Sequence, residues 1–171
     1  VHAGTRVIIT VMMAVTAMIF RVPSGESVSG GHEDVEVDVN GQGAVIMDAD
    51  SGEVLYAKNP HRKFPPASTT KVMTCVIAIE NIGLDKKVEP GRNVLKVEPT
   101  RIGLKPGVSY NSGDLISAML IKSANDAAFC MAEEIAGDEI SFAVMMNEKA
   151  REIGMENTFF ATASGLPTGR P

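Results

Sequence analysis

The chain has 171 residues, of which 44% are hydrophobic and 22% are charged, and its formal charge at pH 7 is −5. This length allows one domain with a core, and the composition argues against an intrinsically disordered protein. The negative charge argues against nucleic-acid binding, and 5% aromatic residues without tryptophan offer no platform for base stacking.

An apolar run from residue 7 to residue 20 lies between two arginines near the N-terminus. The run is shorter than the ~20 residues that cross a membrane, and it is typical of the apolar part of an export signal. We therefore expect residues 1–25 to be a signal peptide, cleaved after Ala17 or near Ser24, or an uncleaved anchor that attaches the chain to the membrane. Both interpretations predict an exported protein, in the periplasm or at the outer face of the cell.

Residues 26–42 are rich in serine, glycine and acidic residues, and they predict a linker. Two apolar runs follow, at 44–47 and 54–57, with Asp-Ala-Asp-Ser-Gly between them. Gly52 supplies the positive φ that a tight turn needs. We therefore expect a β-hairpin immediately after the linker.

The rest of the chain predicts a cluster of helices, since apolar residues recur at helical spacing and glycines follow several of the runs. The first helix has apolar residues on most sides and should be buried. The last one places its apolar residues, Ile140 and Phe142 among them, near one face. The expected helices span residues 68–81, 112–122, 127–137 and 138–154.

The cysteines and histidines show no metal-binding pattern. Cys75 and Cys130 each lie in an apolar helical run, where a thiol behaves as a small hydrophobic group, so we favour core thiols over a disulfide. The three histidines are scattered and form no ligand pair. The sequence therefore predicts neither a metal site nor a cofactor.

A hydroxyl and an amine lie three residues apart at the start of the first predicted helix. Ser68 and Lys71 share one face of a helical turn. Apolar surroundings lower the proton affinity of a lysine, which can then act as a base toward the serine, while amides at the helix start can hold an oxyanion. The pair alone is a weak signal, because a capping serine followed by a solvent-reaching lysine has the same spacing.

A second hydroxyl and an amide, Ser123 and Asn125, lie at the break between two predicted helices. Such a pair can pass a proton to a leaving amine and orient a lysine or a substrate peptide, although helix capping also explains it. Ser109 and Asn111 have the same spacing, but they follow a Lys-Pro-Gly turn where Asn111 or Ser112 is better explained as a helix cap. We therefore favour Ser123 over Ser109.

Three segments, PPASTTKVMT, LISAMLIKSANDAA and FAVMMNEKAREIGMENTFFATASGLP, together resemble the serine-type D-alanyl-D-alanine carboxypeptidases of peptidase family S11, the low-molecular-weight penicillin-binding proteins. The resemblance runs from about residue 44 to residue 167. It implies an α/β fold of the α+β kind, similar to β-lactamases and transpeptidases, with an antiparallel sheet packed against a helical cluster. Residues 43–171 would then be the N-terminal portion of the catalytic domain.

The same resemblance implies a role for each candidate residue. Ser68 would be the acylated nucleophile, Lys71 its general base and Ser123 the proton relay, while Asn125 would hold Lys71 and the substrate amide. The implied partners are peptidoglycan stem peptides and, as acylating inhibitors, β-lactams. The resemblance implies no metal or organic cofactor.

The third sequence box of this enzyme group, Lys-Thr-Gly, does not occur in the 171 residues. In the family it lies downstream, on a strand that supplies an oxyanion donor, and losing one such donor typically costs ~10²–10³ in rate. We therefore expect the front part of a longer enzyme, with an incomplete sheet and uncovered helix faces. The alternatives are a non-catalytic fragment or binding module of the same fold and, less favoured, a β-lactamase, since the chain has Ser-Ala-Asn and no Glu-x-x-Leu-Asn segment.

Overall fold

The computed structural model describes residues 39–167. The predicted signal peptide or anchor, residues 1–25, and most of the predicted linker, residues 26–42, lie outside this range. Within the described part of the chain, no helix is long and apolar enough to span a membrane.

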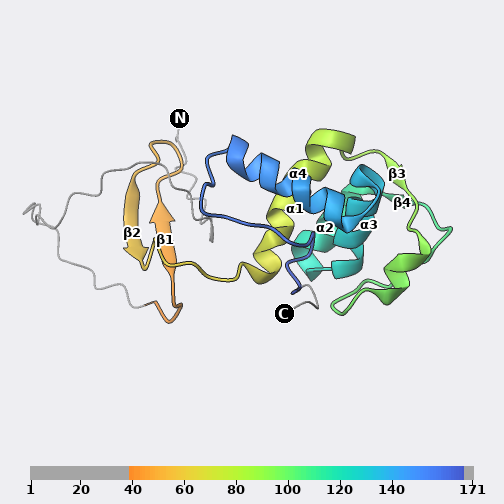
Figure 1. Ribbon diagram of the computed structural model, residues 1–171, viewed down its shortest axis with the longest axis horizontal. Helices are drawn as coiled ribbons and strands as arrows, with labels where there is room; N and C mark the ends of the chain where they lie inside the picture. The colour runs from red at the N-terminus through yellow and green to blue at the C-terminus, as the bar shows by residue number, and fades with distance from the viewer. Residues whose placement is uncertain (1–38, 168–171) are drawn as a thin grey trace, which may run out of the picture.

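The chain begins with a two-stranded antiparallel sheet, formed by β1 (Ala44–Met47) and β2 (Val54–Lys58). In the turn between them, the Asp48 carboxylate accepts a hydrogen bond from the amide of Ser51, and Gly52 has a φ of +74°. The predicted hairpin is thereby confirmed. Figure 1 shows the hairpin at one end of the molecule, away from the four α-helices.

Four α-helices follow, and local sequence signals set their ends. The side chains of Asn111 and Asp138 accept hydrogen bonds from backbone amides at the starts of two helices, and Gly83 and Gly137, both with positive φ, follow the ends of two helices. These are the caps that satisfy unpaired backbone groups. The helices are α1 (Thr70–Ile82), α2 (Ser112–Lys122), α3 (Asn125–Ala136) and α4 (Glu139–Glu152).

Two details between and before the helices differ from the sequence prediction. A 3₁₀ turn, η1 (Ala67–Thr69), precedes α1, so the α-helix begins two residues later than predicted. The connection between α1 and α2 contains two short paired strands, β3 (Lys87–Val88) and β4 (Tyr110–Asn111), and a 3₁₀ turn, η2 (Arg92–Lys96). Strands of two residues are too short to show the alternation of side chains that identifies a strand in sequence.

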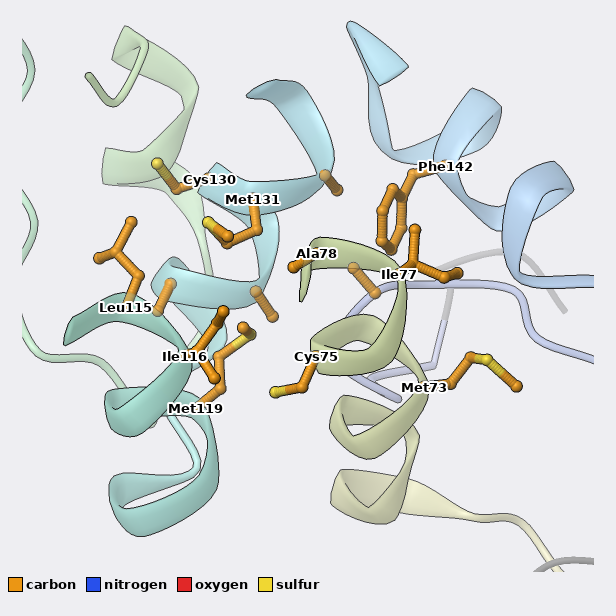
Figure 2. Close-up of a cluster of buried hydrophobic side chains, with 14 of the residues drawn as sticks. Met73, Cys75, Ile77, Ala78, Leu115, Ile116, Met119, Cys130, Met131 and Phe142 are labelled. Atoms are coloured by element: carbon orange, nitrogen blue, oxygen red, sulfur yellow. The ribbon is translucent and has the colours of Figure 1, made fainter. Parts of the chain in front are cut away.

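The core lies between the four helices and includes buried side chains of the segments around them, such as Val88 and Phe160. Figure 2 shows side chains from α1, α2, α3 and α4 directed into one cluster. Many of these side chains are fully buried, which is the condition under which apolar groups contribute most to stability. The large ones are Leu115, Met119, Met131, Phe142 and Met146.

Both cysteines are free thiols in this core. Figure 2 places them in separate parts of the cluster: Cys75 faces Met119 and Ile116 of α2, and Cys130 lies elsewhere, on α3. Burial raises the pKa of the Cys75 thiol to about 11 and that of Cys130 to about 12. The preference for core thiols over a disulfide is confirmed.

The prediction that α1 is buried on most sides is wrong for one face. Val72, Val76 and Ile79, at positions i, i+4 and i+7, are 51%, 37% and 49% exposed. Ile140, expected near the apolar face of the last helix, is 80% exposed in the first turn of α4, whereas Phe142 is fully buried. The expectation of uncovered helix faces therefore holds for α1 among the described residues.

Candidate active site

Three distant parts of the chain meet at the amine of Lys71. Its Nζ lies 3.2 Å from Ser68 Oγ and 3.3 Å from Ser123 Oγ, and it donates a hydrogen bond of 3.0 Å to the carbonyl oxygen of Ser164. Ser68 comes from η1, Ser123 from the junction of α2 and α3, and Ser164 from the segment after α4. Figure 1 shows this last segment turning at the end of α4 and running back past α1.

Both serines are presented by strained backbone. Ala67, immediately before Ser68, has a φ of +46°, and Ser123 has a φ of +55° at the end of α2. Residues other than glycine rarely adopt these left-handed conformations, and such strain is concentrated at functional sites. At Ser123, the left-handed turn ends one helix and directs the hydroxyl toward Lys71 before the next helix begins.

The amine is buried without a charged partner. Lys71 is 1% exposed, and none of the ion pairs within residues 39–167 includes it. Burial lowers the pKa of Lys71 below its ordinary value of 10.5, an effect that the nearby Cys75 opposes only in part. Ser68, in contrast, is exposed. A buried amine with a lowered pKa therefore contacts a hydroxyl that a substrate can reach.

The backbone amides after Ser68 are less free than the sequence suggested. The amide of Thr69 donates to the carbonyl of Pro66, and that of Thr70 donates to carbonyls of the 3₁₀ turn. Because the chain enters the helix through this tight turn, two of the amides expected to be available for an oxyanion are already occupied.

Asn125 is fixed in a way that the sequence did not predict. Its side-chain amide donates hydrogen bonds to the carbonyl oxygens of Glu98 and Pro99, at 3.2 and 2.8 Å. The hydrogen bonds that the structure gives Lys71 go to the three serines and not to Asn125. The expected contact between Asn125 and Lys71 is therefore corrected: the amide anchors a neighbouring loop to the start of α3.

The next residue, Asp126, anchors the same loop. Its buried carboxylate accepts hydrogen bonds from the backbone amides of Ile102, Gly103 and Leu104, at 3.1, 2.8 and 3.1 Å, and from that of Ala127. Several backbone donors compensate a buried carboxylate for its lost hydration. Together, Asn125 and Asp126 fix the loop beside the Ser123 turn.

The alternative pair, Ser109 and Asn111, does not contribute to the site around Lys71. Asn111 caps α2 through the amide of Gly113, and the neighbouring Ser112 donates its hydroxyl to the carbonyl of Gly83. Ser109 is exposed in the preceding loop. The structure therefore places Ser123, and not Ser109, beside Lys71.

Sequence reasoning missed the carbonyl of Ser164 as a partner of Lys71. The residues around it have no periodic pattern, and a backbone carbonyl carries no mark of its own in a sequence. One signal was available: Thr74, a polar residue in an apolar helix one turn after Lys71, needs an acceptor when it is buried. That acceptor is the carbonyl oxygen of Ala163, next to Ser164.

The chain matches known proteins along most of its length. The family model described as D-alanyl-D-alanine carboxypeptidase, peptidase family S11, matches residues 30–170. The D-alanyl-D-alanine carboxypeptidase DacF of Bacillus subtilis is 32% identical over 166 residues, which are 94% of this chain and 42% of that protein. The chain thus spans well under half the length of this relative.

Solved structures of similar proteins share the fold. The D-alanyl-D-alanine carboxypeptidase DacD of Francisella tularensis is 30% identical with a TM-score of 0.74, over 86% of this chain and 38% of that one. Penicillin-binding protein D2 of Listeria monocytogenes, in its ampicillin-bound form, is 31% identical with a TM-score of 0.62, over 75% and 53%. The chain therefore belongs to peptidase family S11, the D-alanyl-D-alanine carboxypeptidases.

Proposed function

We propose that this protein is a serine D,D-carboxypeptidase that removes the terminal D-alanine from peptidoglycan stem peptides through an acyl-enzyme. The observation that carries the proposal is the buried Lys71 amine, which has no charged partner and contacts the hydroxyls of Ser68 and Ser123. Membership in the S11 family supplies the substrate class.

The geometry supports a specific sequence of proton transfers. Ser68 Oγ attacks the carbonyl of the D-alanyl-D-alanine bond and gives its proton to the neutral amine of Lys71, 3.2 Å away. The amine returns a proton through Ser123 to the nitrogen of the leaving D-alanine, since Ser123 Oγ also lies within reach of Nζ. Water then hydrolyses the ester on Ser68 and restores the hydroxyl.

β-Lactams should acylate the same serine. Their strained amide presents a carbonyl to Ser68 in place of the peptide carbonyl, and opening of the ring leaves the nitrogen attached to the adduct. The Listeria relative has been solved in an ampicillin-bound form. Acylation by a penicillin therefore reports directly on the nucleophile and its base.

Asn125 is assigned to the substrate rather than to the lysine. Its side-chain amide is tied to the loop at Glu98 and Pro99, which holds the residue rigidly two positions after Ser123. A rigid support is what a residue needs to orient a substrate amide. We assign no second oxyanion donor, because the 171 residues contain no Lys-Thr-Gly box.

The proposed substrates, which belong to the cell wall, support a location outside the cytoplasm. We propose that residues 1–25 direct export, either as a cleaved signal or as an anchor that attaches the protein to the membrane. N-terminal sequencing of the protein from the cell envelope distinguishes a cleaved form from an uncleaved one. A protein recovered intact from the cytoplasm alone contradicts this proposal.

Labelling with a fluorescent penicillin tests the nucleophile. Both the 171-residue chain and the longest product of its gene should be examined, and D-alanine release from a D-alanyl-D-alanine peptide should be measured in parallel. The expected result is a covalent label that Ser68→Ala abolishes and Ser123→Ala strongly slows, while Ser109→Ala, the matched control, has no effect. A longest product that takes no label, or that labels equally after Ser68→Ala, contradicts the proposal.

A non-catalytic binding module is a second candidate for these residues, because the Lys-Thr-Gly box is absent from them and one face of α1 is uncovered. This candidate predicts binding of the peptide without D-alanine release. A β-lactamase would instead turn over a chromogenic cephalosporin many times per Ser68. The amounts of released D-alanine and of hydrolysed cephalosporin per labelled protein therefore distinguish a carboxypeptidase, a binding module and a β-lactamase.

A further inference from the structure

The segment of residues 162–166 supplies the carbonyl that holds Lys71, although it belongs to no helix or strand. Thr162, Ala163 and Ser164 are nonetheless buried, with exposures of 8%, 0% and 5%. An irregular segment buried to this degree must have its backbone groups satisfied by specific partners. Those partners indicate how the site is kept in place.

Thr74 provides the first attachment. Its side chain is fully buried, and its hydroxyl donates a 2.7 Å hydrogen bond to the carbonyl oxygen of Ala163. A threonine inside a helix ordinarily bonds to a carbonyl of the preceding turn. Here Lys71 and Thr74, three residues apart on one face of α1, bond instead to the consecutive carbonyls of Ser164 and Ala163.

Gly165 provides the second attachment, because the absence of a side chain lets its backbone approach the start of α1 closely. A Cβ at this position would lie 1.8 Å from the carbonyl oxygen of Ala67 and 2.7 Å from Thr70 Oγ1. Both distances are far below van der Waals contact, and the φ of Gly165 is +79°. The backbone at Gly165 therefore packs directly against the turn that carries Ser68, with no room for a side chain between them.

A third contact attaches the segment to α4. The amide of Ala163 donates to the Glu139 carboxylate in the first turn of α4, at 3.1 Å. The peptide groups of Ala163 and Ser164 are thus held from α1 and from α4 together, which leaves the Ser164 carbonyl little freedom to move away from Lys71.

We propose that Thr74 and Gly165 are positioning residues of the site: they seat the 162–166 segment against the start of α1, so that the Ser164 carbonyl holds the Lys71 amine between Ser68 and Ser123. This inference rests on the proposed function, because Lys71, which the two residues position, is the general base of that function. Neither residue contacts the reacting atoms.

Thr74→Val tests the first attachment, because it replaces a hydroxyl by a methyl group of similar shape. The rate of labelling by a fluorescent penicillin should fall by about tenfold, the size expected for one hydrogen bond. Thr74→Ser, which keeps the hydroxyl, should restore most of the rate. As a readout independent of acylation, the side-chain NMR signals of Lys71 should titrate at higher pH in Thr74→Val, since water reaches the amine.

Gly165→Ala tests the second attachment, with Gly154→Ala as a matched control. Gly154 has a φ of +82°, close to that of Gly165, but no atom lies within 4 Å of the Cβ that a side chain would add. Both variants carry the same backbone strain, and only Gly165→Ala forces the segment away from Ala67. We expect about a hundredfold slower labelling in Gly165→Ala, as for a displacement of about 1 Å, and wild-type labelling in Gly154→Ala.

The two readouts separate failure of this inference from failure of the proposed function. A wild-type protein that takes no label contradicts the proposed function, and the NMR titration of Lys71 then decides the inference alone. If Thr74→Val and Gly165→Ala melt at lower temperature but titrate and label as the wild type does, the residues are purely structural. That result overturns the inference. A Gly154→Ala variant whose labelling rate falls as much as that of Gly165→Ala also overturns it.

Discussion

The hairpin and the helical cluster bury their apolar side chains to very different extents. In the hairpin, Ile46 is 46% exposed and Leu55 is 62% exposed, whereas Phe142 and Met146 of α4 are fully buried. Figure 1 shows the two regions as separate parts of the molecule. The helical cluster therefore has a core of its own, and the hairpin, which is held by its backbone ladder and turn, lacks one among the described residues.

This difference matters for function because the candidate site belongs entirely to the region with the core. Lys71 is among the largest fully buried side chains, and α1, which carries it, also contributes Ile77 and Ala78 to the hydrophobic core. An amine can be kept dehydrated only where its surroundings are packed, since a loose site admits water. The lowered pKa of Lys71 therefore depends on the tight packing of the helices around it.

Lys71→Met should have the largest effect, and in opposite directions on activity and stability. Penicillin labelling should fall by about 10²–10⁴, the usual contribution of a general base. The free energy of unfolding should rise, because an apolar side chain of similar length replaces a buried amine without a charged partner. Labelling kinetics check the first expectation and denaturant melts check the second. A variant that labels at the wild-type rate contradicts the role of Lys71 as general base.

The pH dependence of that stability difference has a definite sign. Burial lowers the pKa of Lys71 in the folded state, whereas unfolding restores its ordinary value of 10.5. Between these two pKa values the unfolded chain binds the extra proton, so the wild type gains stability as the pH rises through this window. The advantage of Lys71→Met should consequently be greatest below the lowered pKa of the folded state and shrink as the pH rises from there toward 10.5. A pH-independent difference contradicts this account.

A matched pair of truncations compares the two regions directly. Phe142→Ala should lower the free energy of unfolding by about 3–5 kcal/mol, because it opens a cavity in the helical core. Leu55→Ala, on the exposed side of the hairpin, should change it by less than about 0.5 kcal/mol. Urea denaturation of both variants gives the comparison, and equal losses of stability at the two positions contradict a core that excludes the hairpin.

Asp126→Asn should have an intermediate effect. The amide keeps the shape of the carboxylate but turns an NH₂ group toward backbone donors, so about 1–3 kcal/mol of stability should be lost. Asp50→Asn, in the exposed hairpin turn, serves as the control and should be nearly neutral. Hydrogen exchange should localise the change to the amides of Ile102, Gly103 and Leu104.

Ile140→Ser should have the smallest effect. This side chain is 80% exposed although its spacing assigns it to the core face. The free energy of unfolding should therefore change by less than about 0.5 kcal/mol in thermal or chemical melts of the chain. A loss comparable to that of Phe142→Ala contradicts the placement of Ile140 at the surface.

The parts of the fold that depend on neighbours in sequence could be predicted. The hairpin turn at Gly52, the Asn111 cap and the glycines after α1 and α3 are each determined by a few adjacent residues. The Ser68–Lys71 contact is of the same kind, because a single helical turn creates it. Ser123 was placed beside Lys71 from its helix-break context and a family resemblance, which carried the long-range information that spacing lacks.

The contacts that escaped prediction are long-range and involve the backbone. Lys71 and Ser164 are separated by 93 positions, and Thr74 and Ala163 by 89. No local pattern encodes such a pairing, since a carbonyl acceptor exists at every residue. Asn125 was misassigned for a related reason: its amide suits several acceptors, and only the path of the loop at Glu98 and Pro99 decides among them.

The most direct test of the account is a side-chain NMR titration of Lys71 in the wild-type chain, with the signal assigned by its absence in Lys71→Met. The account predicts a midpoint clearly below the ordinary 10.5, together with a penicillin-labelling rate that rises with the same midpoint. An amine that titrates at or above 10.5 contradicts the claim that burial makes Lys71 the base for Ser68.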